Sequence, residues 1–543
     1  MNPATIYHRP LSEFAFATDA THYVFRLRTG KGEAQSCRFF YADRAAMAPE
    51  LDFACLPMKK IREDRYFDWY EVRLETKLER IAYYFELSDG VETLCYFGDC
   101  YEMAGTPTRA DFFQLPFNHR ADRLSVPEWT KDAVVYNIFP DSFADGFRTL
   151  SGGADGKTGL GGTIRGIAEN LDYIASMGFN CIYLNPIFAA ESYHRYDTLD
   201  YYQVDPHMGS KEDVRALVEK AHSLGIRVLL DGVFNHVGRN FWAFKDVQEK
   251  GQASEYCDWF AGLNFGGQSP CGDNFWYEGW NGYYNLVKLN LRNWHVCDYL
   301  IDAVKLWMDE FHIDGIRFDA ADCVDFDFFR RIHNFCKERN PEFWLMGEII
   351  HGDYKRWANP EMLDSVTNYE CYKGIYSSHN DKNYFEINYS INRQFGNGGI
   401  YQGIALYNFV DNHDVNRLAS TLSDQRYLPL CYTLMYCMPG IPSIYYGSEY
   451  GVMGRHENNS DDGLRPCLDL DNLNRSGNLD LYRHLVKLGR IYHAYPALRT
   501  GSYYTVEVRN RQLLFAKEQD GRTVYVALNL EDCPSEFRFG THV

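Results

Sequence analysis

Length, composition and charge narrow the class of protein before any motif is considered. The 543 residues exceed one ordinary domain and 45% of them are hydrophobic, so we expect a globular chain of two or three domains. The net charge of −19 argues against a nucleic-acid partner, because such proteins usually present a basic face. Aromatic residues make up 16% of the chain, which fits ligand-binding surfaces and aromatic cores equally well.

Cysteine usage and the N-terminus bear on the cellular compartment. The fifteen cysteines run from Cys37 to Cys533 without a C-x-x-C pair. This pattern favours reduced thiols in a cytoplasmic protein over a disulfide framework or a zinc site. The first residues lack the basic start and apolar stretch of a secretion signal, and no apolar run reaches the length of a membrane span. We therefore expect a cytoplasmic protein with no membrane partner.

Residues 1–120 are predicted to form an N-terminal β-sandwich. Short apolar segments separated by turns are typical of such a domain, and they cover residues 22–29, 36–43, 67–75 and 80–88. Asp89-Gly90 predicts a two-residue hairpin that joins residues 80–88 to residues 91–98. Residues 113–129, which contain two prolines, are predicted to be a linker.

Residues 121–495 show apolar strands alternating with amphipathic helices, which predicts an α/β domain. In one helix, Ser210 caps residues 211–224, Asp213 is the acidic third residue and Gly225 ends the helix. Eight strand candidates favour a (β/α)8 TIM barrel. A doubly wound sheet is the alternative, but no glycine-rich phosphate loop follows the first strand. The strand candidates are residues 133–140, 179–188, 227–236, 315–321, 343–350, 365–369, 404–414 and 443–451.

Two further segments complete the predicted organisation. The longest insertion, residues 237–290, follows the third barrel strand and holds four tryptophans among glycines. Because loops at the carboxyl ends of barrel strands build the active site, we expect this loop-rich insertion to form one wall of it. Residues 496–543 are predicted to form a short C-terminal β domain with strands in 505–518 and 522–531.

Charged residues and histidines stand where the predicted barrel strands end. Asp231 is predicted to form a structural ion pair with Arg317, because a carboxylate inside an apolar strand must be paired or used. The carboxyl ends of parallel strands converge on one face, so four carboxylates from four strands favour acid–base chemistry there. The residues are Asp231, His236, Arg317, Asp319, Glu348, His413 and Asp414.

Several of these segments resemble the α-amylase family. DGVFNH at residue 231, GIRFDAA at 315, GEII at 347 and FVDNHD at 409 resemble the four signature regions of the family, in its order. VKLN at residue 287 resembles the additional signature of its neopullulanase, cyclomaltodextrinase and maltogenic amylase branch, and the opening IYHRPLSEFAFA is similar to the extra N-terminal domain of that branch. The resemblance implies a glycoside hydrolase that cleaves α-1,4-glucosidic bonds, with α-1,6 bonds as a further candidate, in cyclodextrins and short maltooligosaccharides.

The resemblance also implies residue roles. Asp319 would be the nucleophile that forms a covalent glycosyl intermediate, and Arg317 would keep it ionised. Glu348 would be the general acid and base, and Asp414 would be the third catalytic acid. Retention of configuration predicts carboxyl oxygens of Asp319 and Glu348 about 5–5.5 Å apart. The implied substrate-binding residues are Tyr196, His236, Arg317, His413, Asp461 and Arg465.

The chain departs from the family pattern at three places. Ile350 stands where many relatives have a tryptophan, and Asp322 and Cys323 stand where relatives often have an Asn-Glu pair. Both changes bear on specificity toward the leaving-group side of the substrate. FADGF at residue 143 and GGTI at 161 lack two acidic residues found in calcium-binding relatives, so we expect no bound calcium and no other cofactor or metal.

Other functions and assemblies stay open at this point. An α-glucosidase or maltogenic amylase that acts on linear oligosaccharides is the nearest alternative, and a non-catalytic barrel scaffold is the alternative from another class. The presence of Asp319, Glu348 and Asp414 favours an enzyme over a scaffold. The resemblance further implies a homodimer in which the N-terminal domain caps the neighbouring active site, with a monomer as the alternative.

Overall fold

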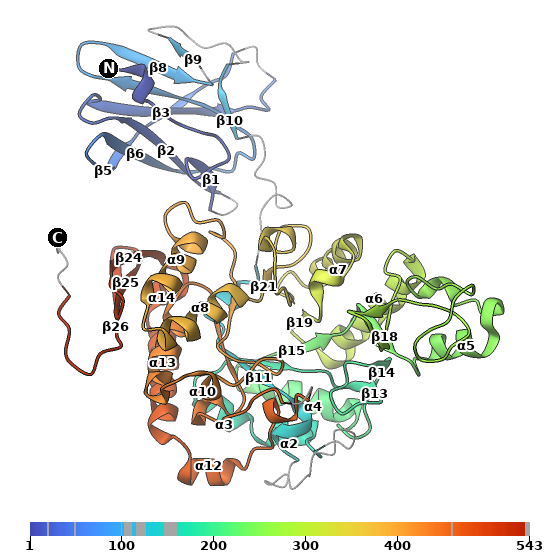
Figure 1. Ribbon diagram of the computed structural model, residues 1–543. Helices are drawn as coiled ribbons and strands as arrows, with labels where there is room; N and C mark the ends of the chain where they lie inside the picture. Colours follow the sequence, from blue (N-terminus) through green and yellow to red (C-terminus); the bar gives the residue numbers. More distant parts are fainter. Residues whose placement is uncertain are drawn as a thin grey trace. The chain divides into compact units, whose positions relative to one another are not determined.

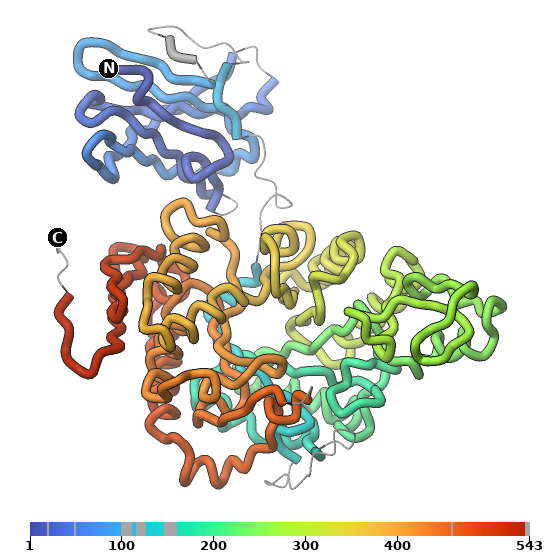
Figure 2. The backbone as a smooth tube through the Cα atoms, in the orientation of Figure 1, coloured from blue at the N-terminus to red at the C-terminus, as the bar shows by residue number. Residues whose placement is uncertain are grey.

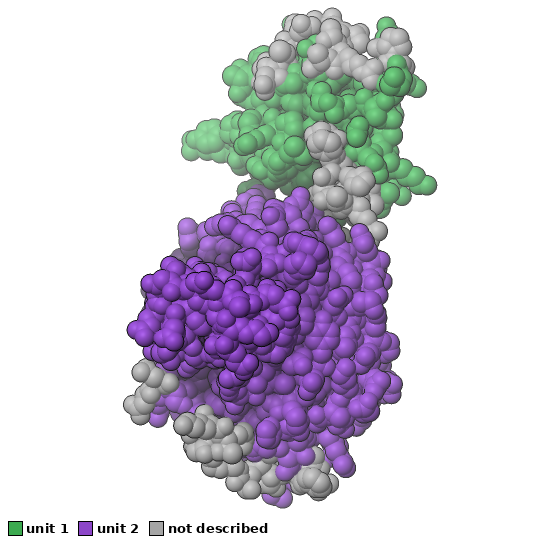
Figure 3. Space-filling model, turned by 90° about the vertical axis from the view of Figure 1, so that its right-hand side faces the viewer, with its two compact units in different colours: residues 1–125 green, residues 126–543 purple. Residues whose placement is uncertain are grey.

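The computed structural model describes residues 1–543 except 19–20, 48–49, 99, 103–110, 116–125, 146–159, 458–459 and 538–543. The chain forms two compact units, Met1–Ser125 and Val126–Val543, which Figure 3 shows in separate colours. Among the described residues, none of the helices combines the length and the apolar character that crossing a membrane requires.

The first unit is a β-sandwich, as predicted. One sheet has the order β1 (Ala15–Ala17), β2 (His22–Gly30), β6 (Phe67–Glu75) and β5 (Lys59–Glu63). The other has the order β4 (Ala54–Pro57), β3 (Ser36–Asp43), β7 (Ile81–Ser88), β8 (Thr93–Phe97) and β9 (Cys100–Glu102). Aromatic side chains from both sheets meet in the core, where the rings of Phe25 and Phe39 lie 4.4 Å apart.

Two local predictions for this unit were wrong. The hairpin after β7 has four loop residues, because Ser88 pairs with Thr93 and the Asp89 carboxylate accepts hydrogen bonds from the N–H groups of Val91 and Glu92. The predicted linker begins with a strand, β10 (Phe113–Leu115), which pairs with β7 and buries its two apolar side chains. It ends in a short helix, Glu128–Asp132, and the residues between, 116–125, lie outside the described part of the chain.

The second unit contains a barrel of eight parallel strands, and all eight predicted segments supply one strand each. An isolated parallel bridge from Thr367 to Tyr407 joins the two ends of the sheet. The predicted TIM barrel is therefore confirmed, and the doubly wound alternative is wrong because such a sheet stays open. In spatial order the strands are β21 (Ser365–Val366), β20 (Trp344–Gly347), β19 (Gly315–Phe318), β15 (Arg227–Gly232), β12 (Cys181–Leu184), β11 (Val135–Ile138), β23 (Ile441–Tyr445) and β22 (Tyr407–Asn408).

Helices surround the barrel strands (Figure 1). The predicted capping box is present in α4 (Lys211–Ser223), where Ser210 and Asp213 exchange hydrogen bonds, and Gly225 follows the helix with a φ of 74°. The other helices of eight residues or more are α5 (Trp242–Lys250), α6 (Trp294–Leu306), α7 (Phe326–Arg339), α8 (Tyr369–Asn380), α9 (Tyr384–Phe395), α11 (Leu428–Cys437) and α13 (Leu479–Ala494).

The insertion after β15 leaves the barrel and returns to it, as the green part of the tube in Figure 2 shows. It contains α5 and a small sheet of β16 (His236–Gly238), β18 (Tyr283–Lys288) and β17 (Gly279–Trp280). A three-stranded antiparallel sheet, β24 (Ser502–Val508), β25 (Gln512–Gln519) and β26 (Arg522–Asn529), ends the second unit.

Candidate active site

A buried arginine joins the carboxylates at the ends of three neighbouring strands. The sheet register places Arg317 on β19 opposite Asp231 on β15. Its Nη1 lies 2.9 Å from Asp231 Oδ1 and 3.0 Å from Asp319 Oδ1, and its Nη2 lies 2.8 Å from Glu348 Oε2. The predicted ion pair between Asp231 and Arg317 is confirmed. The same guanidinium group also holds Asp319 and Glu348 beside each other.

The turn after the nucleophile candidate fixes the position of Glu348. Ala320 has a φ of 43°, in the left-handed region that few residues other than glycine adopt. In this conformation its N–H donates to Glu348 Oε2 over 3.1 Å. The hydroxyl of Tyr369 donates to the other oxygen, Oε1, over 3.3 Å. Both oxygens of Glu348 are therefore held by groups from separate barrel loops.

Burial alters the protonation of the two neighbouring acids. It raises the pKa of Asp319 well above its ordinary value; the charge of Arg317 opposes this rise and the charge of Glu348 adds to it. Burial also raises the pKa of Glu348, again against the charge of Arg317. The charge of Arg317 thus acts on the pKa of Asp319 in the expected direction, but burial outweighs it, because this one positive charge is shared among three carboxylates. The two acids together hold one proton more readily than exposed carboxylates do.

Asp414 is the most accessible of the three predicted catalytic acids. Its side chain is 39% exposed, whereas the side chains of Asp319 and Glu348 are each 11% exposed. His413 Nε2 lies 2.9 Å from Asp414 Oδ2, and Arg465 Nη2 lies 3.1 Å from Oδ1. Burial raises the pKa of Asp414, but the charges of His413 and Arg465 outweigh this and lower it below its ordinary value. Asp414 is thus a carboxylate that stays ionised under acidic conditions.

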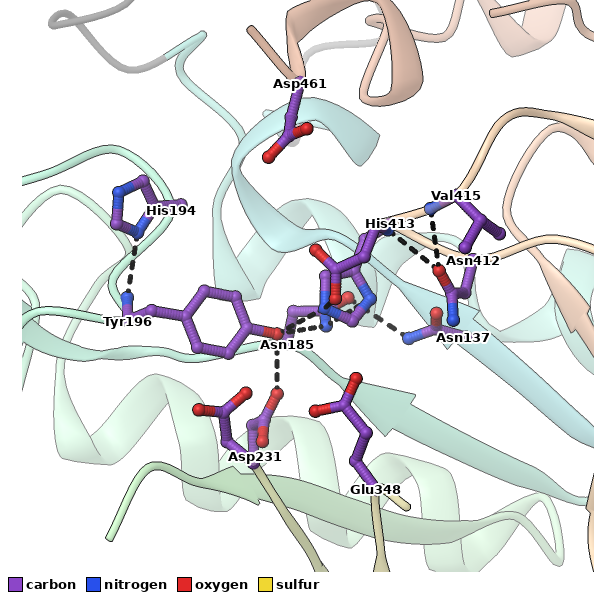
Figure 4. Close-up of polar contacts among 12 residues, drawn as sticks. Asn137, Asn185, His194, Tyr196, Asp231, Glu348, Asn412, His413, Val415 and Asp461 are labelled. Carbon is purple, nitrogen blue, oxygen red and sulfur yellow. Dashed lines mark hydrogen bonds and ion pairs between the residues drawn. The ribbon is translucent and has the colours of Figure 1, made fainter. Parts of the chain in front are cut away.

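Tyr196 connects two sides of the site. Its hydroxyl oxygen lies 2.9 Å from Asp231 Oδ2 and 2.6 Å from His413 Nε2, and it accepts a hydrogen bond from Asn185 Nδ2 over 2.9 Å. Its ring is stacked on the ring of His413, with centroids 5.6 Å apart. In Figure 4 these groups surround the Tyr196 hydroxyl, and Glu348 points toward them from its strand. The predicted residues Tyr196 and His413 therefore lie within one network.

His236 brings an unused polar atom to the same place. The residue is 1% exposed, and its Nε2 lies 3.9 Å from Asp319 Oδ2. This nitrogen has no hydrogen-bond partner among the described residues. Burial lowers the pKa of His236 to about 3, so the ring is neutral. A buried polar atom without a partner is unfavourable unless a ligand satisfies it, so the ring can receive a ligand hydroxyl.

The last predicted pair, Asp461 and Arg465, also reaches the site. Arg465 is nearly buried, and its Nη2 lies 3.1 Å from both Asp461 Oδ2 and Asp414 Oδ1. Its Nε donates to the backbone oxygen of His413 over 3.1 Å. Arg465 therefore holds Asp414 in place, whereas Asp461 contacts the other acids only through Arg465 and also pairs with His456 over 2.7 Å.

Sequence reasoning missed three residues of this site. Asn185 Nδ2 lies within 3.1 Å of the hydroxyls of Tyr183 and Tyr196 and of His413 Nδ1. Its position directly after the strand β12 was the available signal. Tyr369 begins α8, three residues after the end of β21, so its place near a strand end could have identified it. Trp280 offered only its aromatic character.

Trp280 brings the insertion to the site. Its ring lies 5.5 Å from the ring of His236, so the prediction that the insertion forms one wall is confirmed. Ile350, where relatives often have a tryptophan, is 41% exposed. Part of the segment FADGF, residues 146–147, lies outside the described residues.

The geometry defines what the site can do. Two carboxyl groups that share one guanidinium and both have a raised pKa can divide the roles of acid and nucleophile. A third carboxylate, kept ionised by His413 and Arg465, can accept hydrogen bonds from hydroxyl groups. The neutral ring of His236 and the hydroxyl of Tyr196 add uncharged polar contacts. This set suits a neutral, hydroxyl-rich substrate.

Comparison with known proteins agrees with this description. Residues 137–478 match the family described as alpha amylase, catalytic domain, and residues 1–119 match the alpha amylase N-terminal ig-like domain. A cyclomaltodextrinase of Geobacillus thermopakistaniensis (strain MAS1) is 33% identical over 97% of this chain and 91% of its own length. An intracellular maltogenic amylase of Bacillus subtilis (strain 168) is 33% identical over 84% of this chain and 79% of its own. A solved cyclomaltodextrinase structure superposes with a TM-score of 0.77 at 30% identity, covering 97% of this chain and 91% of that one.

Proposed function

Because the chain belongs to the α-amylase family, we propose that it hydrolyses α-1,4-glucosidic bonds in cyclodextrins and short maltooligosaccharides with retention of configuration. One observation carries the proposal: a single buried guanidinium, that of Arg317, lies within 3.0 Å of oxygens of both Asp319 and Glu348. Two acids in such contact suit a double-displacement reaction. A barrel that served only as a scaffold would have no use for three acids around an unpartnered histidine.

In the first step, Asp319 Oδ attacks the anomeric carbon while the proton on Glu348 moves to the glycosidic oxygen, which leaves as a hydroxyl. The product of this step is an ester between the sugar and Asp319. In the second step, Glu348 takes a proton from water, the resulting hydroxide attacks the anomeric carbon, and Asp319 leaves as a carboxylate. Asp414 accepts hydrogen bonds from sugar hydroxyls and stabilises the positive charge that develops on the ring.

The remaining site residues bind the sugar or hold the acids. Arg317 and Arg465 are positioning residues, since each contacts carboxylates rather than open space. His236 donates to or accepts from a sugar hydroxyl through its free nitrogen. His413 and Tyr196, which contact each other, bind the sugar from the other side of the site. Asp461 binds a more distant sugar unit.

The experiment that tests this proposal follows the anomeric configuration of the products. Purified enzyme is given β-cyclodextrin, maltotriose or pullulan, and ¹H NMR records the first anomer released. We expect the α-anomer from the first two substrates, and a 2-deoxy-2-fluoro glycosyl fluoride should add its sugar mass to the peptide that contains Asp319. Release of the β-anomer, or labelling elsewhere, would reject the proposal. Products from linear chains alone would favour the α-glucosidase or maltogenic amylase alternative.

We further propose that the protein works in the cytoplasm as a homodimer formed through residues 1–120. The fifteen cysteines without a C-x-x-C pair, and similarity to a relative described as intracellular, support the first point. Resemblance to the neopullulanase and cyclomaltodextrinase branch supports the second. Sedimentation that shows only monomer at working concentration would remove the dimer.

A further inference from the structure

We propose a second α-glucan-binding surface on the insertion, made by the rings of Trp242, Tyr256, Trp259 and Tyr299 together with Trp294; we call it the aromatic platform. This inference rests on the proposed function, because it assumes that α-glucans are the ligands of this protein. The platform is separate from the wall that Trp280 forms at the catalytic acids.

The three exposed tryptophans among the described residues belong to one segment of the chain. Trp242 is 39% exposed, Trp276 is 37% exposed and Trp294 is 60% exposed, whereas the other seven of the ten tryptophans are half-buried or buried. All three lie between residues 242 and 294. A single exposed aromatic group is ordinary, but Trp242 also contacts the rings of three further aromatic residues, which makes a contiguous aromatic surface and a candidate binding face.

The rings of the platform are fixed before any ligand arrives. Trp242 lies 5.3 Å from Trp259 and 5.7 Å from Tyr299, ring centre to ring centre. Its Nε1 donates to the Tyr299 hydroxyl over 3.1 Å, which sets the tilt of the indole. Tyr256 packs edge-on against both Trp242 and Trp259, at 4.9 and 5.3 Å. Preset rings lose little conformational entropy on binding.

Trp294 extends the platform along α6. It is the first residue of the helix that carries Tyr299. The side chain of the preceding residue, Asn293, donates to the backbone oxygen of Asp258 over 3.1 Å, next to Trp259. The ring of Trp294 is stacked on the ring of His295, with centroids 3.7 Å apart. The hydrogen bond of Asn293 ties the start of α6, where Trp294 is 60% exposed, to the loop that carries the half-buried Trp259.

The charges around the platform select the class of ligand. Burial raises the pKa of Tyr256 and Tyr299, and the negative charges of Glu255 and Asp200 add to the rise. Asp302 has the same effect on the neighbouring Tyr202, whereas Lys250 opposes the rise at Tyr256, so carboxylates predominate beside the rings. Carboxylates accept hydrogen bonds from hydroxyl groups and repel phosphates. The apolar face of a pyranose ring can lie on an indole while its hydroxyls reach this rim. A neutral glucan chain fits, and a nucleic acid or an anionic lipid does not.

The platform and the catalytic site share one insertion. The segment starts at His236, whose ring is 5.5 Å from Trp280, and it ends at α6. A glucan held at the platform would therefore raise the concentration of its own chain near the acids. This advantage applies to long glucans and not to a substrate that fills only the catalytic site.

The test uses the full chain with Glu348→Gln, which prevents digestion, in native gels that contain amylopectin. We expect Trp294→Ala and Trp242→Ala each to weaken retardation about fivefold, as loss of one aromatic contact implies. In the active enzyme, the same substitutions should leave hydrolysis of p-nitrophenyl maltoside unchanged and slow hydrolysis of amylopectin. Phe385→Ala and Tyr389→Ala are matched controls, since these residues are 47% and 69% exposed on α9 and should change neither reading.

Unchanged retardation in both tryptophan variants, or an equal loss in the α9 controls, would overturn the platform. Unchanged retardation with a shift of the sedimentation coefficient from dimer to monomer would assign the surface to a second copy of the chain instead. Trp294→Ala alone suffices if Trp242→Ala melts early, because Trp294 is the less buried of the two. Failure of the wild-type enzyme to cleave the maltoside would reject the proposed function but leave the retardation result valid.

Discussion

Arg317 and Asp231 form a buried ion pair in which one guanidinium nitrogen lies 2.9 Å and 3.1 Å from the two carboxylate oxygens. The hydroxyl of Tyr183 donates to the same carboxylate over 2.7 Å. Asp231 is therefore fully engaged inside the protein, whereas Asp319 and Glu348 each keep part of their surface open. Carboxylates that contact the same arginine thus differ in role: Asp231 is a structural partner, and the other two can meet a substrate.

Substitution of Asp231 by asparagine should lower the free energy of unfolding by about 3 kcal/mol, because it leaves a buried arginine without its main partner. Asp319→Asn is the matched comparison: the Arg317–Asp231 pair remains, so we expect near-normal stability with loss of measurable turnover. Urea unfolding followed by circular dichroism compares the two variants. If Asp231→Asn unfolds like the wild type, the pair does not have the structural role assigned to it.

Glu348→Gln should lower kcat on maltotriose by a factor of about 10² to 10⁴, the usual contribution of a general acid. The same variant should lose far less activity on α-maltosyl fluoride, since fluoride leaves without a proton. In the wild type, activity should fall as pH rises through the elevated pKa of Glu348, because the acid must be protonated. The variant should lack this alkaline decline with the fluoride substrate. If the activity of both enzymes declined at the same alkaline pH, the decline would belong to a group other than Glu348.

The N-terminal unit should lose stability in mild acid because of His8. This residue is buried, with ring nitrogens 2.7 Å from the Arg26 backbone oxygen and 2.9 Å from the Tyr83 hydroxyl. Burial lowers the pKa of His8 from 6.5 to about 4. The unfolded chain therefore binds a proton more readily: the full stability is present above pH 6.5 and is lost as pH falls toward 4, by about 3 kcal/mol in all.

Hydrogen exchange of peptides from β7, measured from pH 7.5 to pH 4.5, reports this loss. We expect His8→Gln to reduce the pH dependence of their protection. His22→Gln is the control, because His22 is on β2, the strand whose Arg26 contacts His8, with a side chain that is 52% exposed, and it should behave as the wild type. Equal pH dependence in all three proteins would show that another group is responsible.

Treatment with EDTA followed by gel filtration should leave kcat and the melting temperature unchanged. The segments FADGF and GGTI lack two acidic ligands that calcium requires in related sites, so we propose that the enzyme needs no calcium there. A loss of activity that added Ca²⁺ restores would contradict this. The restored melting temperature would then also report the affinity of the ion.

Much of this protein follows from its sequence alone. The eight barrel strands, the capping box at Ser210 and the side chains that meet at one face were all predictable. The physical reason is local: an apolar strand and an amphipathic helix each show their own period, and parallel strands in a barrel bring their carboxyl ends together. Asp319 and Glu348 belong to one site on these grounds alone.

Only the tertiary structure shows which partners each of those residues contacts. Arg317 binds Asp231, 86 residues away, as well as Asp319, two residues away, and burial raises the pKa of Asp319 against the charge of Arg317. Asn185 and Trp280 reach the site through contacts that no local pattern contains. The direction of each side chain, and the desolvation that follows, depend on packing between segments that are far apart in the chain. For that reason the composition of the site was predictable and its proton distribution was not.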